Sequence, residues 1–149
     1  MSDFKVDKRF VLAGHAIFTV HNGQGTSYTF RVMKAEADGN YQDSWFISLL
    51  TGPDNKHDYT YVGKIDPIQA RVRLTRQSRY NCDSLPVKVI NWVLPKIWQD
   101  KPLPEGYGCH GAGYCGRCGI QLTAEPGVNP EGFRYGYGPT CWKKMQGIT

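Results

Sequence analysis

Five short runs of β-branched and aromatic residues, separated by turn-forming residues, most constrain the fold of this chain. They precede the one long helical pattern and comprise residues 16–20, 27–32, 45–50, 59–65 and 70–74. Such residues suit a half-buried strand, and the stretch 21–25, rich in Gly and Asn, has the composition of a hairpin turn. Short turns between successive runs favour antiparallel pairing. The pattern predicts an antiparallel sheet of about five strands, arranged as a meander.

One helical pattern follows the strand runs. Ser84 suits an N-cap, and apolar residues then recur at intervals of three and four from Val87 to Ile97. Pro95 lies inside this pattern, so we expect the helix to kink there or to end one turn early. The helix would cover one face of the sheet, which gives an α+β fold. The other face is then a candidate binding surface unless loops or the tail cover it.

A stretch rich in proline and charge, residues 99–106, predicts a linker after the helix. The expected boundary lies near residue 103. Residues 1–103 would form the sheet-plus-helix domain, and residues 104–149 a small module of the zinc-ribbon or zinc-knuckle type.

Three cysteines in this tail predict one structural Zn²⁺. Cys115 and Cys118 are separated by two residues, a spacing at which both thiolates can reach one ion across a tight turn. Cys141 would supply a third thiolate. Pro139 suits the first turn of a short helix through residues 142–145, whose amino-terminal partial charge favours a thiolate.

The fourth zinc ligand stays open between His110 and Cys109, and binding of no metal is a further alternative. Disulfides are the competing explanation for the cysteines. The chain has five cysteines, an odd number, and residues 1–5 show no hydrophobic signal segment, so we expect a reducing cytoplasm. Cys82 is interpreted as an unpaired structural thiol.

Basic residues are concentrated in one part of the chain. The formal net charge is +5, and the stretch from Lys64 to Arg79 alone holds five basic residues against one acid, an excess of four. Its arginines are Arg71, Arg73, Arg76 and Arg79. Arg71 and Arg73 would face the same side of a strand. The stretch predicts contacts with phosphates, and the alternative is a solvated strand face.

The tail combines arginines with tyrosines. Arg117 and Arg134 could contact phosphates while Tyr135 or Tyr137 stacks on bases. A small metal module also needs aromatic side chains for its own core, which is the alternative role for these tyrosines. No run approaches the ~18 apolar residues of a membrane-spanning helix, so no membrane role is expected.

The sequence favours a protein without catalytic activity, and an enzyme stays an open alternative. A filled zinc tetrahedron leaves no position for an activated water, and the His-x-Glu and Pro-Cys-x-x-Cys signatures of deaminases are missing. Phosphate-loop signatures are missing as well. The best clue to a small-ligand site is an aromatic and acidic cluster, Trp45, Asp54, Asp58, Tyr59 and Tyr61.

Many separate blocks of the chain resemble an uncharacterised family of bacterial and bacteriophage proteins, known as a domain of unknown function with a zinc-ribbon-like tail. The blocks are residues 18–20, 28–32, 45–55, 58–63, 74–78, His110, 115–119, 122–123 and 138–141. The resemblance implies one metal-bearing family but no activity. The chain departs from the family pattern in Cys109 beside His110 and in a longer insert, residues 126–134.

Two functional hypotheses follow. In the first, the protein is a non-catalytic zinc protein of phage or mobile-element type that contacts nucleic acid through its basic, aromatic surface. In the second, it is a protein interaction module, such as a phage-encoded inhibitor of a host defence or nucleic-acid-processing machine, acting in the host cytoplasm.

Overall fold

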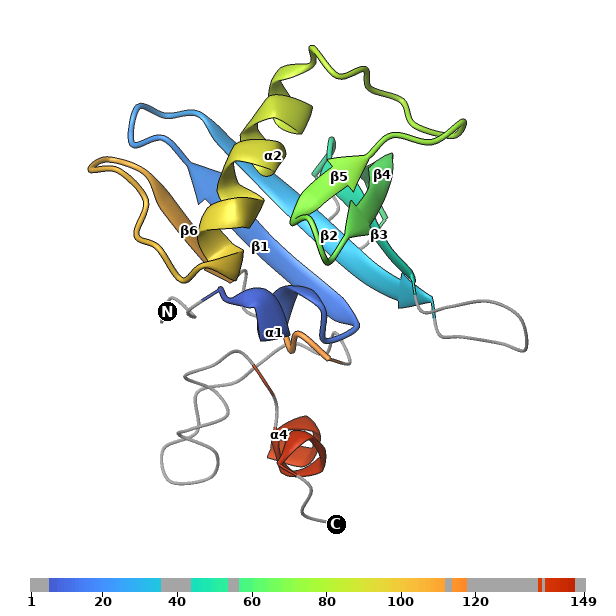
Figure 1. Ribbon diagram of the computed structural model, residues 1–149, viewed down its shortest axis with the longest axis vertical. Coiled ribbons are helices and arrows are strands. Elements are labelled where there is room, and N and C mark those ends of the chain that lie inside the picture. The colour runs from blue at the N-terminus through green and yellow to red at the C-terminus, as the bar shows by residue number, and fades with distance from the viewer. Residues whose placement is uncertain are drawn as a thin grey trace.

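Six antiparallel strands form one sheet in the computed structural model (Figure 1). The structure describes residues 6–35, 44–53, 57–111, 114–117, 137 and 139–146, with only the backbone of Pro139, Thr140 and Trp142. The strands are β1 (His15–His21), β2 (Ser27–Ala35), β3 (Ser44–Leu50), β4 (Tyr59–Asp66), β5 (Arg71–Arg73) and β6 (Gly108–Gly111). Their order is β5-β4-β3-β2-β1-β6. The predicted five-strand meander is confirmed, and β6 adds a sixth strand beside β1.

The hairpin between β1 and β2 owes its shape to an asparagine and two glycines. Asn22 Oδ1 accepts hydrogen bonds from the amides of Gln24 and Thr26, at 2.8 and 3.2 Å. Gly23 and Gly25 have φ angles of +74° and +91°, in the left-handed region that glycine enters without strain. The composition of this stretch predicted the hairpin correctly.

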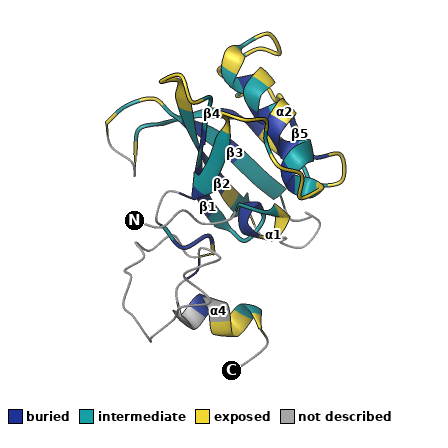
Figure 2. Ribbon diagram, turned by 90° about the vertical axis from the view of Figure 1, so that its left-hand side faces the viewer, coloured by how far each residue is buried: buried dark blue, intermediate teal, exposed yellow. Residues whose placement is uncertain are grey.

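Helix α2 (Leu85–Trp98) packs across one face of the sheet, with one buried side and one exposed side (Figure 2). Its buried residues are those of the predicted apolar stripe: Val87, Ile90, Val93, Leu94 and Ile97. The helix continues through Pro95 to Trp98, so the prediction of an early end is wrong. It ends in a Schellman motif, in which the amide of Lys101 donates to Lys96 O at 2.8 Å. Asp100 occupies the left-handed position there, with φ +54°.

Strand β6 lies C-terminal to the predicted domain boundary near residue 103, yet it completes the sheet of the first domain. In its pairing with β1, His110 lies opposite Thr19 and Cys109 opposite Val20. Cys115, Tyr137 and Cys141 also belong to the same buried cluster as the sheet and α2. The sheet and core therefore draw on both sides of that boundary.

Two short helices complete the described structure. Helix α1 (Lys8–Val11) was not predicted, although Asp7 is a good N-cap and its Oδ1 accepts the amide of Phe10 at 2.8 Å. Helix α4 (Pro139–Met145) matches the predicted short helix and begins at the proline.

The register of the strands divides their side chains between two faces. Val20, Val32 and Ile47 are buried on the face beneath α2. Alternate residues project to the opposite face, which we call the outer face. The β3–β4 register shifts between Ile47 and Ser48, so Val62 has no partner of its own. Because of this shift, Tyr61 and Lys64 both project to the outer face.

Candidate nucleic-acid interface and metal centre

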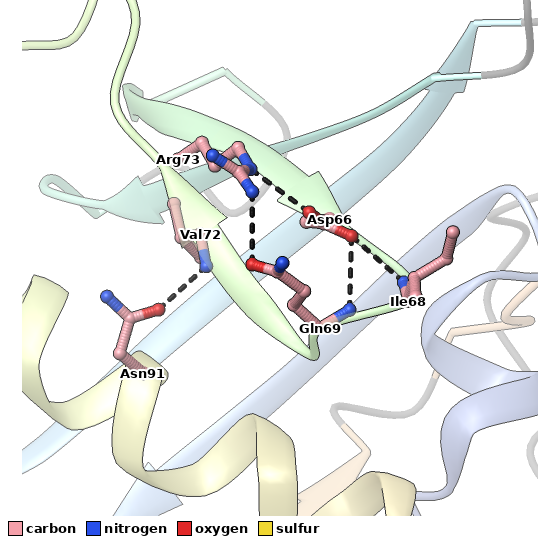
Figure 3. A network of polar contacts seen from close by, with 6 residues as sticks. All are labelled: Asp66, Ile68, Gln69, Val72, Arg73 and Asn91. Carbon is pink, nitrogen blue, oxygen red and sulfur yellow. Dashed lines mark hydrogen bonds and ion pairs between the residues drawn. The ribbon is translucent and has the colours of Figure 1, made fainter.

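The turn between β4 and β5 holds Arg73 in place on the outer face (Figure 3). Asp66 Oδ1 accepts the amides of Ile68 and Gln69 at 3.0 and 3.1 Å. Its Oδ2 lies 3.0 Å from Arg73 Nε in an ion pair, and Arg73 also donates to Gln69 Oε1 at 3.0 Å. The Gln69 amide, with a further contribution from Arg73, holds the pKa of the Asp66 carboxyl below its usual range. The turn is therefore fixed by charge as well as by backbone hydrogen bonds.

Helix α2 holds the same strand from the other side. Asn91 Oδ1 accepts the amide of Val72 at 2.7 Å, as Figure 3 shows. Val72 is 2% exposed and packs beneath α2, whereas Arg71 and Arg73 on either side of it are exposed. Both arginines thus project from the outer face, as the period-two pattern predicted. Asn91 also blocks a backbone donor on an edge strand, which limits pairing with other chains.

The loop after β5 folds back onto β4. The amide of Arg79 donates to Tyr61 O at 3.2 Å, and Thr75 Oγ1 donates to Tyr61 Oη at 3.1 Å. Ser78 closes the loop because its hydroxyl accepts the amide of Thr75 at 2.8 Å. These bonds bring Arg76 and Arg79, both exposed, beside the strands that carry the other arginines.

Three cations and two rings therefore share the β4–β5 end of the outer face, and two further arginines lie in the adjoining loop that is bonded to β4. We call this set of seven residues the basic surface. Its members are Lys64, Arg71, Arg73, Arg76, Arg79, Phe46 and Tyr61. Lys64 lies opposite Arg73 and Phe46 opposite Lys64 in the strand register. The rings of Phe46 and Tyr61 are half-buried, with centroids 6.2 Å apart. Within the described residues only Arg73 of these cations forms an ion pair, which leaves four for an anionic partner.

The sequence did not assign Phe46 or Tyr61 to the nucleic-acid surface, although Tyr61 was named in the suggested small-ligand cluster. Phe46 and Tyr61 are separated along the chain, and only the β3–β4 register brings them together. Strict alternation from the buried Ile47 would have placed Phe46 on the outer face. The register shift in β4 interrupts this alternation, so the sequence does not show that Tyr61 lies on the outer face.

The predicted tail contacts are divided by the structure. Arg117 is exposed, whereas Tyr137 is 1% exposed and its ring lies 6.0 Å from that of Phe10. Burial raises the pKa of the Tyr137 hydroxyl. A buried ring offers no face to a base, so Tyr137 occupies the alternative role, that of a core residue. Arg134 and Tyr135 lie outside the described residues.

Two of the predicted zinc ligands lie in one buried cluster. Cys115 and Cys141 are 0% and 6% exposed, and both pack into the core cluster that also holds Tyr137. Arg117 donates to Cys141 Sγ at 3.6 Å. The amide of His15 donates to Gly116 O at 2.8 Å, which anchors this part of the tail to the start of β1. Cys118, the other half of the knuckle, lies outside the described residues.

Neither candidate for the fourth ligand lies with these two thiols. His110 pairs with Thr19, four residues of β1 beyond the His15–Gly116 contact, a separation of about 13 Å along an extended strand. Its ring projects to the outer face and lies 5.3 Å from that of His21. Cys109 faces α2, and burial raises the pKa of its thiol to about 12. No three His, Cys, Asp or Glu side chains gather as metal ligands within the described residues.

The aromatic and acidic cluster suggested as a small-ligand site is not assembled by the described residues. Trp45 lies on the α2 side, where its indole N–H donates to Leu12 O at 3.0 Å. Tyr59 and Tyr61 project to the outer face instead. Asp54 lies outside the described residues.

No family model, curated protein or solved structure matches this chain. Among the helices of the described segments, none has the length and apolar character needed to cross a bilayer. Because no comparison matches, the functional proposal rests on the geometry of the basic surface.

Proposed function

We propose that this protein binds nucleic acid, without catalysis, through the basic surface. One observation carries the proposal: four cations that form no ion pair within the described residues extend from β4, β5 and the loop bonded to β4, next to the rings of Phe46 and Tyr61. They are Lys64, Arg71, Arg76 and Arg79. Cations release the counterions of a phosphate backbone, and this release dominates the affinity of most nucleic-acid complexes. The surrounding hydrogen bonds fix the backbone positions from which these cations extend.

Single strands are the favoured form. Their bases can splay onto aromatic rings of a sheet while arginines follow the backbone, whereas a duplex keeps its base faces stacked internally. Phe46 and Tyr61 supply such rings, and the hydrogen bond from Thr75 holds the Tyr61 hydroxyl. Each stacked base contributes about 1–3 kcal/mol in comparable sites.

Fluorescence anisotropy with a labelled twelve-nucleotide single strand at low salt tests the proposal. We expect saturable binding, weakened about tenfold or more by Tyr61→Ala, since one base loses its stacking partner. Tyr61→Phe is the matched control, because it keeps the ring and should retain most of the affinity. Undetectable binding at low salt would refute the proposal, and equal binding of the corresponding duplex would refute the preference for single strands.

A single structural Zn²⁺ held by Cys115, Cys118 and Cys141 is part of the proposal. Its support is the common burial of Cys115 and Cys141, which approach the same cluster from distant parts of the chain. Elemental analysis of protein purified without added zinc should find about one equivalent, and Cys118→Ser should reduce it sharply. Metal-free protein with the same unfolding midpoint as the purified sample would contradict this part.

A protein partner is the second candidate function, and Ile68 is the observation that favours it. This side chain is 92% exposed at the tip of the turn that Asp66 fixes. An apolar residue on a rigid turn is a suitable anchor for a pocket on another protein. Ile68→Asp should abolish specific partner capture from a nuclease-treated host lysate. Unchanged capture would exclude this role for Ile68.

A further inference from the structure

A second potential binding site lies on the opposite side of the sheet from the basic surface. A cavity of about 290 Å³ opens between the first half of α2 and the β1–β2 hairpin. Val20 and Tyr28 line it from the sheet, Val89 and Trp92 from α2, and Tyr107 from the segment before β6. These residues share nothing with the basic surface, so a ligand here would bind independently of nucleic acid.

Aromatic rings form one wall of this cavity. Trp92 and Tyr107 meet edge to face, with ring centroids 5.1 Å apart, and they remain 36% and 45% exposed. Two large aromatic side chains this accessible leave considerable apolar area in water, which a ligand in the cavity would cover. A flat ring fits such a wall best, because stacked and edge-to-face contacts both require planarity.

The same wall carries one indole N–H donor with no acceptor among the described residues. The indole N–H groups of Trp45 and Trp98 donate to Leu12 O and Pro67 O, at 3.0 and 2.6 Å. The indole N–H of Trp92, in contrast, meets no acceptor in the part of the chain that the structure describes. Lys96 does not line the cavity, but its Nζ lies 5.0 Å from the centroid of the Trp92 ring and adds positive charge beside this wall. The chemistry suits a ligand that bears a carboxylate or carbonyl acceptor.

We propose that this cavity binds a planar aromatic molecule of one or two fused rings with an acceptor group. Its size supports this class, because a dry cavity of about 150 Å³ accepts benzene and this one is nearly twice as large. A ligand with about thirteen heavy atoms at ordinary efficiency would bind with a Kd of about 1 mM or tighter.

Titration of the full chain with 2-naphthoate, followed by the indole N–H signal of Trp92 in ¹H–¹⁵N NMR spectra, tests the proposal. Trp92→Phe assigns the signal. The matched control ligand is 1-adamantanecarboxylate, which has the same number of heavy atoms and the same charge but no flat ring. We expect a saturable shift with 2-naphthoate and binding at least about tenfold weaker for the adamantane compound.

Two variants test whether the ligand binds in the cavity. Val89→Trp should fill it and weaken 2-naphthoate binding by about tenfold or more, and Tyr107→Ala, at an exposed position, removes part of the wall without depending on core repacking. Ile68→Ala, remote from the cavity, should leave the affinity unchanged. The proposal fails if Trp92 shows no saturable shift, if both ligands bind equally, or if folded Val89→Trp and Tyr107→Ala both bind as the wild type does.

Discussion

Removal of the Asn91 side chain should destabilise the protein by a predictable amount. In Asn91→Ala the amide of Val72 loses its acceptor at 2.7 Å, and Val72 is 2% exposed, so water reaches the amide poorly. An unsatisfied buried donor costs about 1–3 kcal/mol. Alanine returns about 0.5 kcal/mol through its higher helix propensity. The expected net loss is about 1.5 kcal/mol in the free energy of unfolding.

Urea denaturation measures this loss, and hydrogen exchange at the Val72 amide locates it. Asn91→Asp is the matched control, because a carboxylate oxygen can still accept the amide and most of the stability should remain. Lys88→Ala, on the exposed side of the same helix, should change the free energy of unfolding by less than about 0.5 kcal/mol. If Asn91→Ala unfolds at the wild-type urea concentration with unchanged Val72 exchange, the role assigned to Asn91 in holding β5 is refuted.

Two further predictions concern stability. Asp100→Gly should stabilise the protein by about 1 kcal/mol. Glycine adopts φ +54° without strain, and the substitution removes a negative charge from a helix C-terminus. A lower urea midpoint for the variant would contradict this. Burial, with a contribution from Arg31, lowers the pKa of His15. Below the ordinary imidazole pKa of about 6.5, His15 is therefore protonated more readily in the unfolded chain than in the folded one. The free energy of unfolding decreases as the pH is lowered, until the pKa of His15 in the folded state is reached. His15→Gln should lose less stability than the wild type between pH 7.5 and 5.5, and an identical loss would exclude this linkage.

The fold was largely predictable because β1 to β5 have strong local signals. Their β-branched and aromatic runs alternate, and turn residues separate them. The strand β6 carries no such signal, since Gly108–Gly111 contains no β-branched residue, and only its pairing with β1 makes it a strand. Cys109 and His110 consequently face opposite sides of the sheet. The spacing of metal ligands along the sequence does not predict this placement.

The basic surface was predictable in part. The spacing of Arg71 and Arg73 predicted their common face, because strand periodicity is a local property. Arg76 and Arg79 join them through hydrogen bonds from their loop to Tyr61, a contact that depends on tertiary structure. The sequence left Tyr137 open between base stacking and a core role for the same reason, since its burial depends on Phe10 at the other end of the chain.

The salt dependence of single-strand binding tests the central claim most directly. With four cations on phosphates, the slope of log Kobs against log salt concentration should be about −2.8, an almost fiftyfold loss of affinity between about 50 and 200 mM salt. Arg71→Gln combined with Arg76→Gln should reduce the slope to about −1.4, whereas Arg73→Gln, already paired with Asp66, should change it less than Arg71→Gln alone. A wild-type slope near zero, or one unchanged by the double substitution, would contradict binding through the basic surface.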